Sequence, residues 1–206
     1  MEEIVGIFPT PLMIARKAVP GDLVDALVKV YGEMTTGSNV RTAKLAHTPM
    51  APPRVHEAFK RTHAQVAPRV KAYGEALMGE TLDWGIKEIW VNRMETGGAQ
   101  KMHNHANSFI SGIIYLTPTH PGSATVFYRR VGADTFQMHN ENERCKVTAF
   151  NTPIFRVPDV GAGDMILFPS YMHHEVPPNQ GPARMTAAFN ALPDRLDSWG
   201  YQVRFK

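Results

Sequence analysis

Beyond Thr81 the sequence is a succession of short segments rich in β-branched and aromatic residues, separated by Gly, Pro, Asn and Asp. The segments recur at intervals of roughly ten residues, which is typical of strands joined by turns in an antiparallel sandwich or jelly roll. This pattern limits the greater part of the chain to a mainly β structure. The predicted strands are Ile86–Met94, Gln100–His105, Phe109–Leu116, Ala124–Tyr128, Lys146–Phe150, Ile154–Val157, Asp164–Phe168, Met172–Val176 and Ala183–Asn190.

The N-terminal segment has a different pattern. Two prolines make Ile4–Ile14 extended, or an edge strand, rather than helical. Apolar residues at helical spacing follow in Asp22–Met34 and again in Val55–Leu77. Pro68 interrupts the second pattern and predicts a kink or two consecutive helices, and Gly79 is the expected stop. We expect these helices to buttress the β-core rather than to form a separate domain.

Length and composition favour one globular unit. The chain has 206 residues, of which 43% are hydrophobic and 20% charged. A chain of this length usually forms one compact domain with a sizeable core. We therefore expect a single domain over residues 1–206, with the helical buttress within 20–80 and the β-core in 84–192.

Charge and cysteine content exclude several classes of protein. The 22 basic and 19 acidic residues leave a net charge of +3 and are spread along the chain, so no binding to nucleic acid or to an anionic membrane is expected. The single cysteine, Cys145, forms neither an internal disulfide nor a cysteine-rich zinc site. The N-terminus is unlike a signal peptide, and the longest mostly apolar stretch, Phe109–Leu116, is too short to span a bilayer. We expect a soluble, cytoplasmic protein.

Nine histidines are the most unusual part of the composition, and four of them fall in two short clusters. The first cluster is His103-Asn104-His105. Residues i and i+2 of a strand point to the same face, so both imidazoles can reach one metal ion. Two surface histidines would have the same spacing, and the pair alone leaves both interpretations open.

The second cluster is His173-His174. Alternation along a strand places His174 on one face and His173 with Glu175 on the other, so only one of the two histidines easily joins the first pair. Alternation favours His174 as the third ligand. A β-bulge near Pro169 would shift the phase and bring His173 to the metal instead.

An arginine follows ten residues after His174. In the predicted strand Ala183–Asn190, Arg184 shares a face with Thr186 and other small residues. A guanidinium on such a face needs an anionic partner if it is buried. A carboxylate ligand bound in bidentate fashion is a suitable partner.

Together, the His-x-His pair, a distal histidine and an arginine ten residues later resemble the iron(II)- and 2-oxoglutarate-dependent oxygenases. More narrowly, the chain is similar to a bacterial and phage group within that superfamily. The matching segments cover most of the chain: Ile7-Phe8-Pro9-Thr10-Pro11, Trp90-Val91-Asn92, His103-Asn104-His105, Ser111-Gly112-Ile113-Ile114-Tyr115-Leu116, Leu167-Phe168-Pro169-Ser170 with His174, and Arg184 through Asn190.

The resemblance implies a double-stranded β-helix, a cupin-like jelly roll with one open mouth. In the superfamily, iron is held by His-x-Asp or His-x-Glu and a distal histidine, which leaves three positions for cosubstrate and oxygen. This sequence departs from the pattern, because His105 stands where the carboxylate is usual. Carried over residue by residue, the metal role falls on His103, His105 and His174, a three-histidine site for Fe(II).

The resemblance also implies a set of cosubstrate contacts. Arg184 would form a salt bridge to the distal carboxylate of 2-oxoglutarate, aided by Thr186. Asn92 and Tyr115 would contribute hydrogen bonds from neighbouring strands. No catalytic residue beyond the metal ligands is implied. The expected reaction is decarboxylation of 2-oxoglutarate by oxygen, coupled to hydroxylation of a C–H bond of an unknown substrate.

Two other functions are compatible with the same residues. One is a cupin-like three-histidine metalloenzyme that does not use 2-oxoglutarate, and the other is a non-catalytic binding barrel. The substrate is expected to be a small molecule or a peptide side chain, and the loops Gly132–Glu143 and Arg41–Pro53 are candidates to frame the mouth. A homodimer formed through helices or edge strands is also compatible with the sequence.

Overall fold

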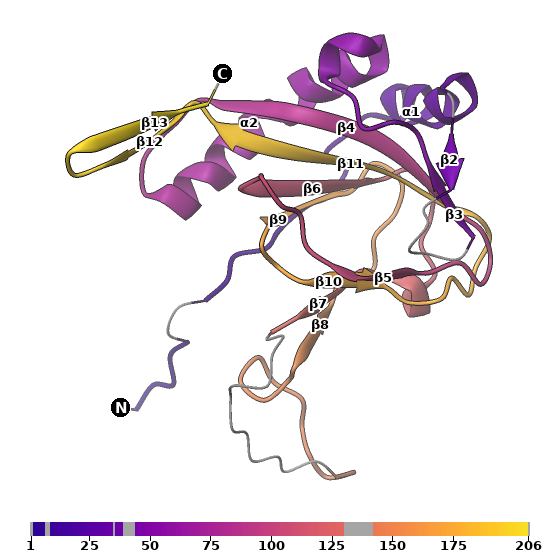
Figure 1. Ribbon diagram of the computed structural model, residues 1–206. Helices are drawn as coiled ribbons and strands as arrows, with labels where there is room; N and C mark the ends of the chain where they lie inside the picture. The colour runs from indigo at the N-terminus through magenta and orange to yellow at the C-terminus, as the bar shows by residue number, and fades with distance from the viewer. Residues whose placement is uncertain (1, 7–8, 35, 39–43, 130–141, 206) are drawn as a thin grey trace.

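The computed structural model describes residues 2–6, 9–34, 36–38, 44–129 and 142–205 (Figure 1). Ile7 and Phe8 of the first matching segment, most of the loop Gly132–Glu143 and residues 41–43 of the loop Arg41–Pro53 lie outside the described residues. The elements, in chain order, are β1 (Met13–Ala15), α1 (Gly21–Glu33), β2 (Gly37–Ser38), β3 (Leu45–His47), η1 (Pro53–Val55), α2 (Glu57–Met78), β4 (Trp84–Met94), β5 (Gln100–His103), β6 (Ile110–Tyr115), η2 (Pro121–Ser123), β7 (Val126–Tyr128), β8 (Ile154–Arg156), β9 (Met165–Pro169), β10 (His174–Val176), β11 (Arg184–Pro193), β12 (Arg195–Ser198) and β13 (Tyr201–Arg204).

Two antiparallel sheets form the β-core. The larger has seven strands in the order β1-β9-β6-β11-β4-β3-β2, and the smaller has four in the order β5-β10-β7-β8. Helices α1 and α2 lie over one side of the large sheet, and the small sheet lies on the other (Figure 1). The structure is therefore a mainly β jelly roll with N-terminal helices packed against it, as the sequence predicts.

Strand β11 lies between β4 and β6 and connects the core to the site. Every residue of the strand except one is buried, which explains its run of small and apolar side chains. Met185, Ala187 and Phe189 belong to the main hydrophobic core, which also contains buried residues of both helices. Alternation places the other residues on the face toward the small sheet: Arg184, Thr186, Ala188 and Asn190.

Helix α2 departs from the prediction at Pro68. The structure has one helix of 22 residues through this position, so the alternative of two consecutive helices is wrong. A proline inside a helix costs about 3 kcal/mol. Burial of Phe59, Val66 and Val70 in the main core opposes that cost. Gly79 caps the helix in the left-handed conformation, with φ of 70°, which confirms the predicted stop.

The strand predictions are confirmed with one exception, since each of the other predicted segments contains a strand. Lys146–Phe150 is irregular, because local side chains satisfy its backbone. The Thr148 N–H donates to Asn151 Oδ1 at 2.7 Å, and the Phe150 N–H donates to Thr148 Oγ1 at 3.2 Å. The sequence patterns did not predict β2, β3 or the C-terminal hairpin of β12 and β13. Within the described part of the chain, no helix is long and apolar enough to cross a membrane.

Gly112 of β6 lies opposite Phe189 of β11, and a Cβ at this glycine would lie 2.1 Å from Phe189 Cζ. We predict that Gly112→Ala lowers the free energy of unfolding by roughly 1–3 kcal/mol, because a fully buried ring must move. Denaturant unfolding followed by circular dichroism measures the change. Gly85→Ala in β4, where nothing lies within 4 Å of the new Cβ, is the matched control and is expected to change stability by under about 1 kcal/mol. Equal stability of the two variants would contradict this role of Gly112.

Candidate metal centre

Three histidine side chains converge at the inner face of the small sheet. His103 ends β5 and His174 begins β10, and the two residues lie directly opposite each other in the pairing of these strands. His105 follows two residues after His103. One ring nitrogen from each lies within 4.8 Å of the other two, so a single ion between them can contact all three.

Hydrogen bonds fix the tautomer of two of these rings. His103 Nδ1 lies 2.9 Å from the Lys101 carbonyl oxygen, and His174 Nδ1 lies 2.9 Å from the Met172 carbonyl oxygen. A carbonyl oxygen only accepts, so each Nδ1 carries the proton and donates it. Nε2 is therefore the unprotonated nitrogen that carries the lone pair, which is the arrangement that a metal-binding histidine needs.

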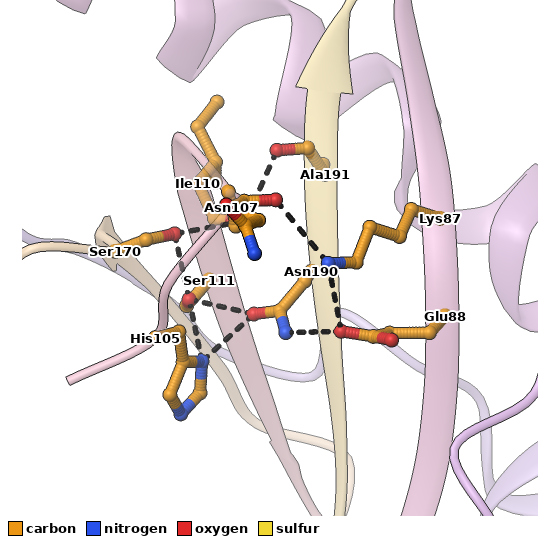
Figure 2. Close-up of polar contacts among 10 residues, drawn as sticks. Lys87, Glu88, His105, Asn107, Ile110, Ser111, Ser170, Asn190 and Ala191 are labelled. Carbon is orange, nitrogen blue, oxygen red and sulfur yellow. Dashed lines mark hydrogen bonds and ion pairs between the residues drawn. The ribbon is translucent and has the colours of Figure 1, made fainter. Parts of the chain in front are cut away.

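His105 lies beyond the end of β5, because the predicted strand Gln100–His105 stops at His103. Other contacts hold its position. Its backbone N–H donates to the Ser170 carbonyl oxygen at 3.0 Å. Its ring Nδ1 lies 2.7 Å from Asn190 Oδ1 and 2.8 Å from Ser111 Oγ (Figure 2). The ring thus joins the other two histidines from a loop rather than from the strand face.

Burial keeps the histidines neutral. Removal from water lowers the pKa of His105 to about 4 and that of His174 to about 3, and it also lowers the pKa of His103. The neighbouring imidazoles lower these pKa values further, since a second positive charge nearby is unfavourable. At neutral pH all three rings are uncharged, which is the protonation state required of metal ligands.

The structure places His174 in the cluster and leaves His173 outside it. The alternation of β10 points His174 inward, where it is buried, whereas His173 is only half-buried. The side chain of Glu175 interacts instead with the hydroxyl of Tyr128. Within the described residues, the cluster therefore contains three imidazoles and no carboxylate.

Arg184 is buried at the start of β11, with a fractional exposure of 4%. Its Nη2 donates to Thr125 Oγ1 at 3.4 Å, and its guanidinium carbon lies 5.4 Å from the centre of the Tyr115 ring. Its Nε is buried without a hydrogen-bond partner. Among the described residues, no carboxylate forms an ion pair with Arg184. A buried cation in this state is costly unless an anionic ligand completes it.

Arg184 and the three histidines line one cavity of about 360 Å³, a volume that includes its open mouth. Of the predicted cosubstrate contacts, Asn92 and Thr186 also line it. Tyr115 does not; it is fully buried, and its ring packs against the Arg184 guanidinium. The complete lining is Trp90, Asn92, Gln100, His103, His105, Ile113, His174, Val176, Arg184, Thr186 and Ala188.

The sequence patterns missed several residues of the site. Gln100 Nε2 lies 3.1 Å from His103 Nε2, the nitrogen that faces the other histidines. Trp90 packs beside His105, with ring centres 5.9 Å apart. Asn190, the last residue of the predicted strand Ala183–Asn190, contacts His105, a role that the strand pattern does not indicate. A glutamine or tryptophan in a strand has no motif of its own, so only the folded arrangement identifies these contacts.

A search against protein-family models finds a match to a family described as "Putative 2OG-Fe(II) oxygenase", over residues 88–190. The match spans half of the chain and contains all three histidines and Arg184. The chain belongs to this family. It is therefore an enzyme of the 2OG-Fe(II) oxygenases, which use iron(II) and 2-oxoglutarate. A search of curated proteins finds no match.

Several solved structures share the fold of this 2OG-Fe(II) oxygenase. HygX from Streptomyces hygroscopicus, with nickel and 2-oxoglutarate bound, has a TM-score of 0.65 at 14% identity, over 89% of this chain and 83% of HygX. The epimerase SnoN from nogalamycin biosynthesis has a TM-score of 0.64 at 11% identity, over 90% and 80%. A prolyl-4-hydroxylase from Pseudomonas putida has a TM-score of 0.58 at 17% identity, over 88% and 92%. At these identities the likeness establishes the fold alone.

The residues present fit both groups that the family uses. Three neutral imidazoles with Nε2 lone pairs suit Fe(II), and the unpartnered Nε of Arg184 suits the carboxylate of 2-oxoglutarate. Both features open into the same cavity.

We predict that His174→Ala lowers the affinity of the protein for Co(II), used as a probe metal, by more than 100-fold. Loss of a ligand's hydrogen-bond partner alone costs roughly 10–100-fold in affinity, and loss of the ligand itself must cost more. Isothermal titration calorimetry measures the affinity. His173→Ala removes the adjacent imidazole, which lies outside the cluster, and is expected to bind as the unaltered protein does. Equal weakening by the two substitutions would contradict the assignment of His174.

Proposed function

We propose that His103, His105 and His174 hold Fe(II), that Arg184 binds the distal carboxylate of 2-oxoglutarate, and that the enzyme hydroxylates a C–H bond of its substrate. The observation that carries this proposal is the buried, unpaired guanidinium in the same cavity as three neutral imidazoles. When bound, iron and 2-oxoglutarate supply the activation of oxygen. The chain supplies binding, orientation and exclusion of water.

The charge of the ligand set favours a dicarboxylate. Three neutral imidazoles leave the full charge of a divalent ion uncompensated, whereas a set with one carboxylate would neutralise part of it. Arg184 adds a second positive charge to the same cavity. A doubly negative ligand that reaches both charges relieves two desolvation penalties at once. 2-Oxoglutarate has this charge and carries its carboxylates at opposite ends.

The contacts around Arg184 orient it for that ligand. Tyr115 packs against the guanidinium, and its hydroxyl lies 3.2 Å from Thr125 Oγ1. We propose that Tyr115 acts by positioning Arg184, rather than through the direct ligand contact expected from the sequence. Thr186 and Asn92 lie directly opposite each other in the pairing of β11 with β4, and both line the cavity. We propose that they donate hydrogen bonds to the bound 2-oxoglutarate.

A cupin-like metalloenzyme that does not use 2-oxoglutarate would also bind its metal through three histidines without a carboxylate, so the ligand set alone does not separate the two functions. Arg184 distinguishes the two functions, because such an enzyme has no need of a buried cation beside its metal. Family membership and Arg184 together favour the oxygenase.

We further propose that the protein acts as one domain over residues 1–206, in the cytoplasm, on a small molecule or a peptide side chain, and that it forms a homodimer. One hydrophobic core joins both helices to the large sheet, which supports a single domain. A cavity of about 360 Å³ admits a small group only. The near-balanced charge speaks against nucleic acid, and the exposed Ile154 and Phe155 on edge strand β8 offer a surface for pairing.

The test is binding of 2-oxoglutarate to the anaerobic Fe(II) protein, measured through the absorption change that accompanies binding. We predict that Arg184→Gln raises the Kd for 2-oxoglutarate by roughly 30-fold or more, because a buried charge pair loses one partner. Metal affinity is expected to stay the same, and thermal unfolding checks that the variant folds. Arg195→Gln, at an ion pair remote from the cavity, is the control. Absence of any absorption change in the unaltered protein would contradict the proposed function.

A further inference from the structure

A chain of hydrogen bonds leads from His105 across the large sheet to a carboxylate. Asn190 Oδ1 lies 2.7 Å from His105 Nδ1, and Asn190 Nδ2 donates to Glu88 Oε1 at 2.7 Å (Figure 2). Asn190 and Glu88 are directly opposite each other in the pairing of β11 with β4. The sheet itself therefore sets the geometry of this chain.

The chemistry of the groups gives the chain a direction. A carboxylate only accepts hydrogen bonds, so the amide NH₂ of Asn190 must face Glu88. The amide oxygen must then face His105, and since that oxygen also only accepts, the proton of the ring must reside on Nδ1. Nε2 keeps its lone pair toward the other two histidines. Glu88 thus fixes the tautomer of His105 through two successive hydrogen bonds, with Asn190 between them.

This arrangement is specific to His105 within the cluster. His103 and His174 donate from Nδ1 to backbone carbonyls two residues earlier in their own segments. Of the three, His105 alone has side-chain partners at Nδ1, and it is the residue that stands where the superfamily pattern has a carboxylate. A carboxylate is nevertheless connected to this histidine, through the amide of Asn190.

We propose that Glu88 and Asn190 are positioning residues of the iron centre, which orient His105, hold its Nε2 lone pair toward the ion and relay negative charge to a ligand set that has none. This inference rests on the proposed function of the three histidines. Hydrogen bonding of a metal-bound histidine to an acceptor increases its basicity, and loss of such a partner weakens metal binding.

The surroundings hold Glu88 in place. Lys87 Nζ lies 3.4 Å from Glu88 Oε1 and donates to the Asn107 carbonyl oxygen at 3.2 Å. Asn190 is buried, and Ser111 donates to its Oδ1 at 2.8 Å, which leaves the amide no room to turn without loss of bonds. Among the described residues, Lys87 is the charged side chain that pairs with Glu88, and it is partly exposed, so it compensates the carboxylate only in part.

The decisive variant is Glu88→Gln. It keeps the shape of the side chain, but it removes the negative charge and the requirement that this side chain only accepts hydrogen bonds. A glutamine both donates and accepts, so the amide of Asn190 is free to turn and His105 to take the other tautomer. Nitrogen-15 spectra of the histidine rings in the metal-free protein are expected to show His105 protonated on Nδ1, and a mixture of tautomers in the variant. The Kd for Co(II), used as a probe metal, is expected to rise 10–100-fold.

Glu95→Gln is the control, because it neutralises an exposed carboxylate just beyond β4 that pairs with Arg93 rather than with the site. It is expected to leave both the tautomer of His105 and the Kd for Co(II) unchanged. An unaltered His105 tautomer together with an unaltered Kd in Glu88→Gln would overturn the inference, since a purely structural network would give that result. Absence of Co(II) binding by the unaltered protein would overturn the proposed function instead, and the tautomer spectra would still report on the chain of bonds.

Discussion

The side chains of β11 alternate between two environments, and both the hydrophobic core and the candidate metal centre depend on that alternation. Phe189 and its neighbours on one face close the core beneath the helices, while the other face carries Arg184 at one end and Asn190 at the other. Pairing on both sides fixes the register of the strand. A register shift of one residue would turn the apolar side chains toward the cavity and the polar side chains toward the core. The same strand register therefore determines both the packing of the core and the position of the site.

Burial of Arg184 on the polar face of β11 has a free-energy cost that an anionic ligand would offset. Burying an ion costs several kcal/mol even after local relaxation, and Arg184 has no acidic partner among the described residues. The three imidazoles are likewise held neutral by burial and are prepared to bind a cation. The cavity thus contains one positive charge without an acidic partner among the described residues and three metal-binding nitrogens, which the proposed metal ion and dicarboxylate would complete together.

The sequence predicted those parts of the site that depend on local geometry. Period-two alternation was sufficient to select His174 over His173 and to place Arg184 and Thr186 on one face. It did not predict how His105 is held, because its contacts come from Ser170, directly after β9, and from Asn190 of β11, both far away in the chain.

The same limit applies to Glu88, whose role depends on lying opposite Asn190 in a pairing that the sequence does not specify. In Lys146–Phe150, β-propensity predicted a strand where Thr148 and Asn151 form local bonds instead. At Pro68 the reverse holds, since core packing continues a helix that local chemistry would interrupt. In each case the prediction was wrong where partners distant in sequence, or side-chain bonds to the backbone, outweighed the propensity of the segment.

A crystal structure with Mn(II) and 2-oxoglutarate bound, with the metal located by its anomalous scattering, tests the central claim most directly. The ion is expected between His103, His105 and His174, with the distal carboxylate of 2-oxoglutarate against Arg184. An ion bound through a carboxylate side chain of the protein, or a 2-oxoglutarate that leaves the guanidinium of Arg184 unpaired, would contradict it.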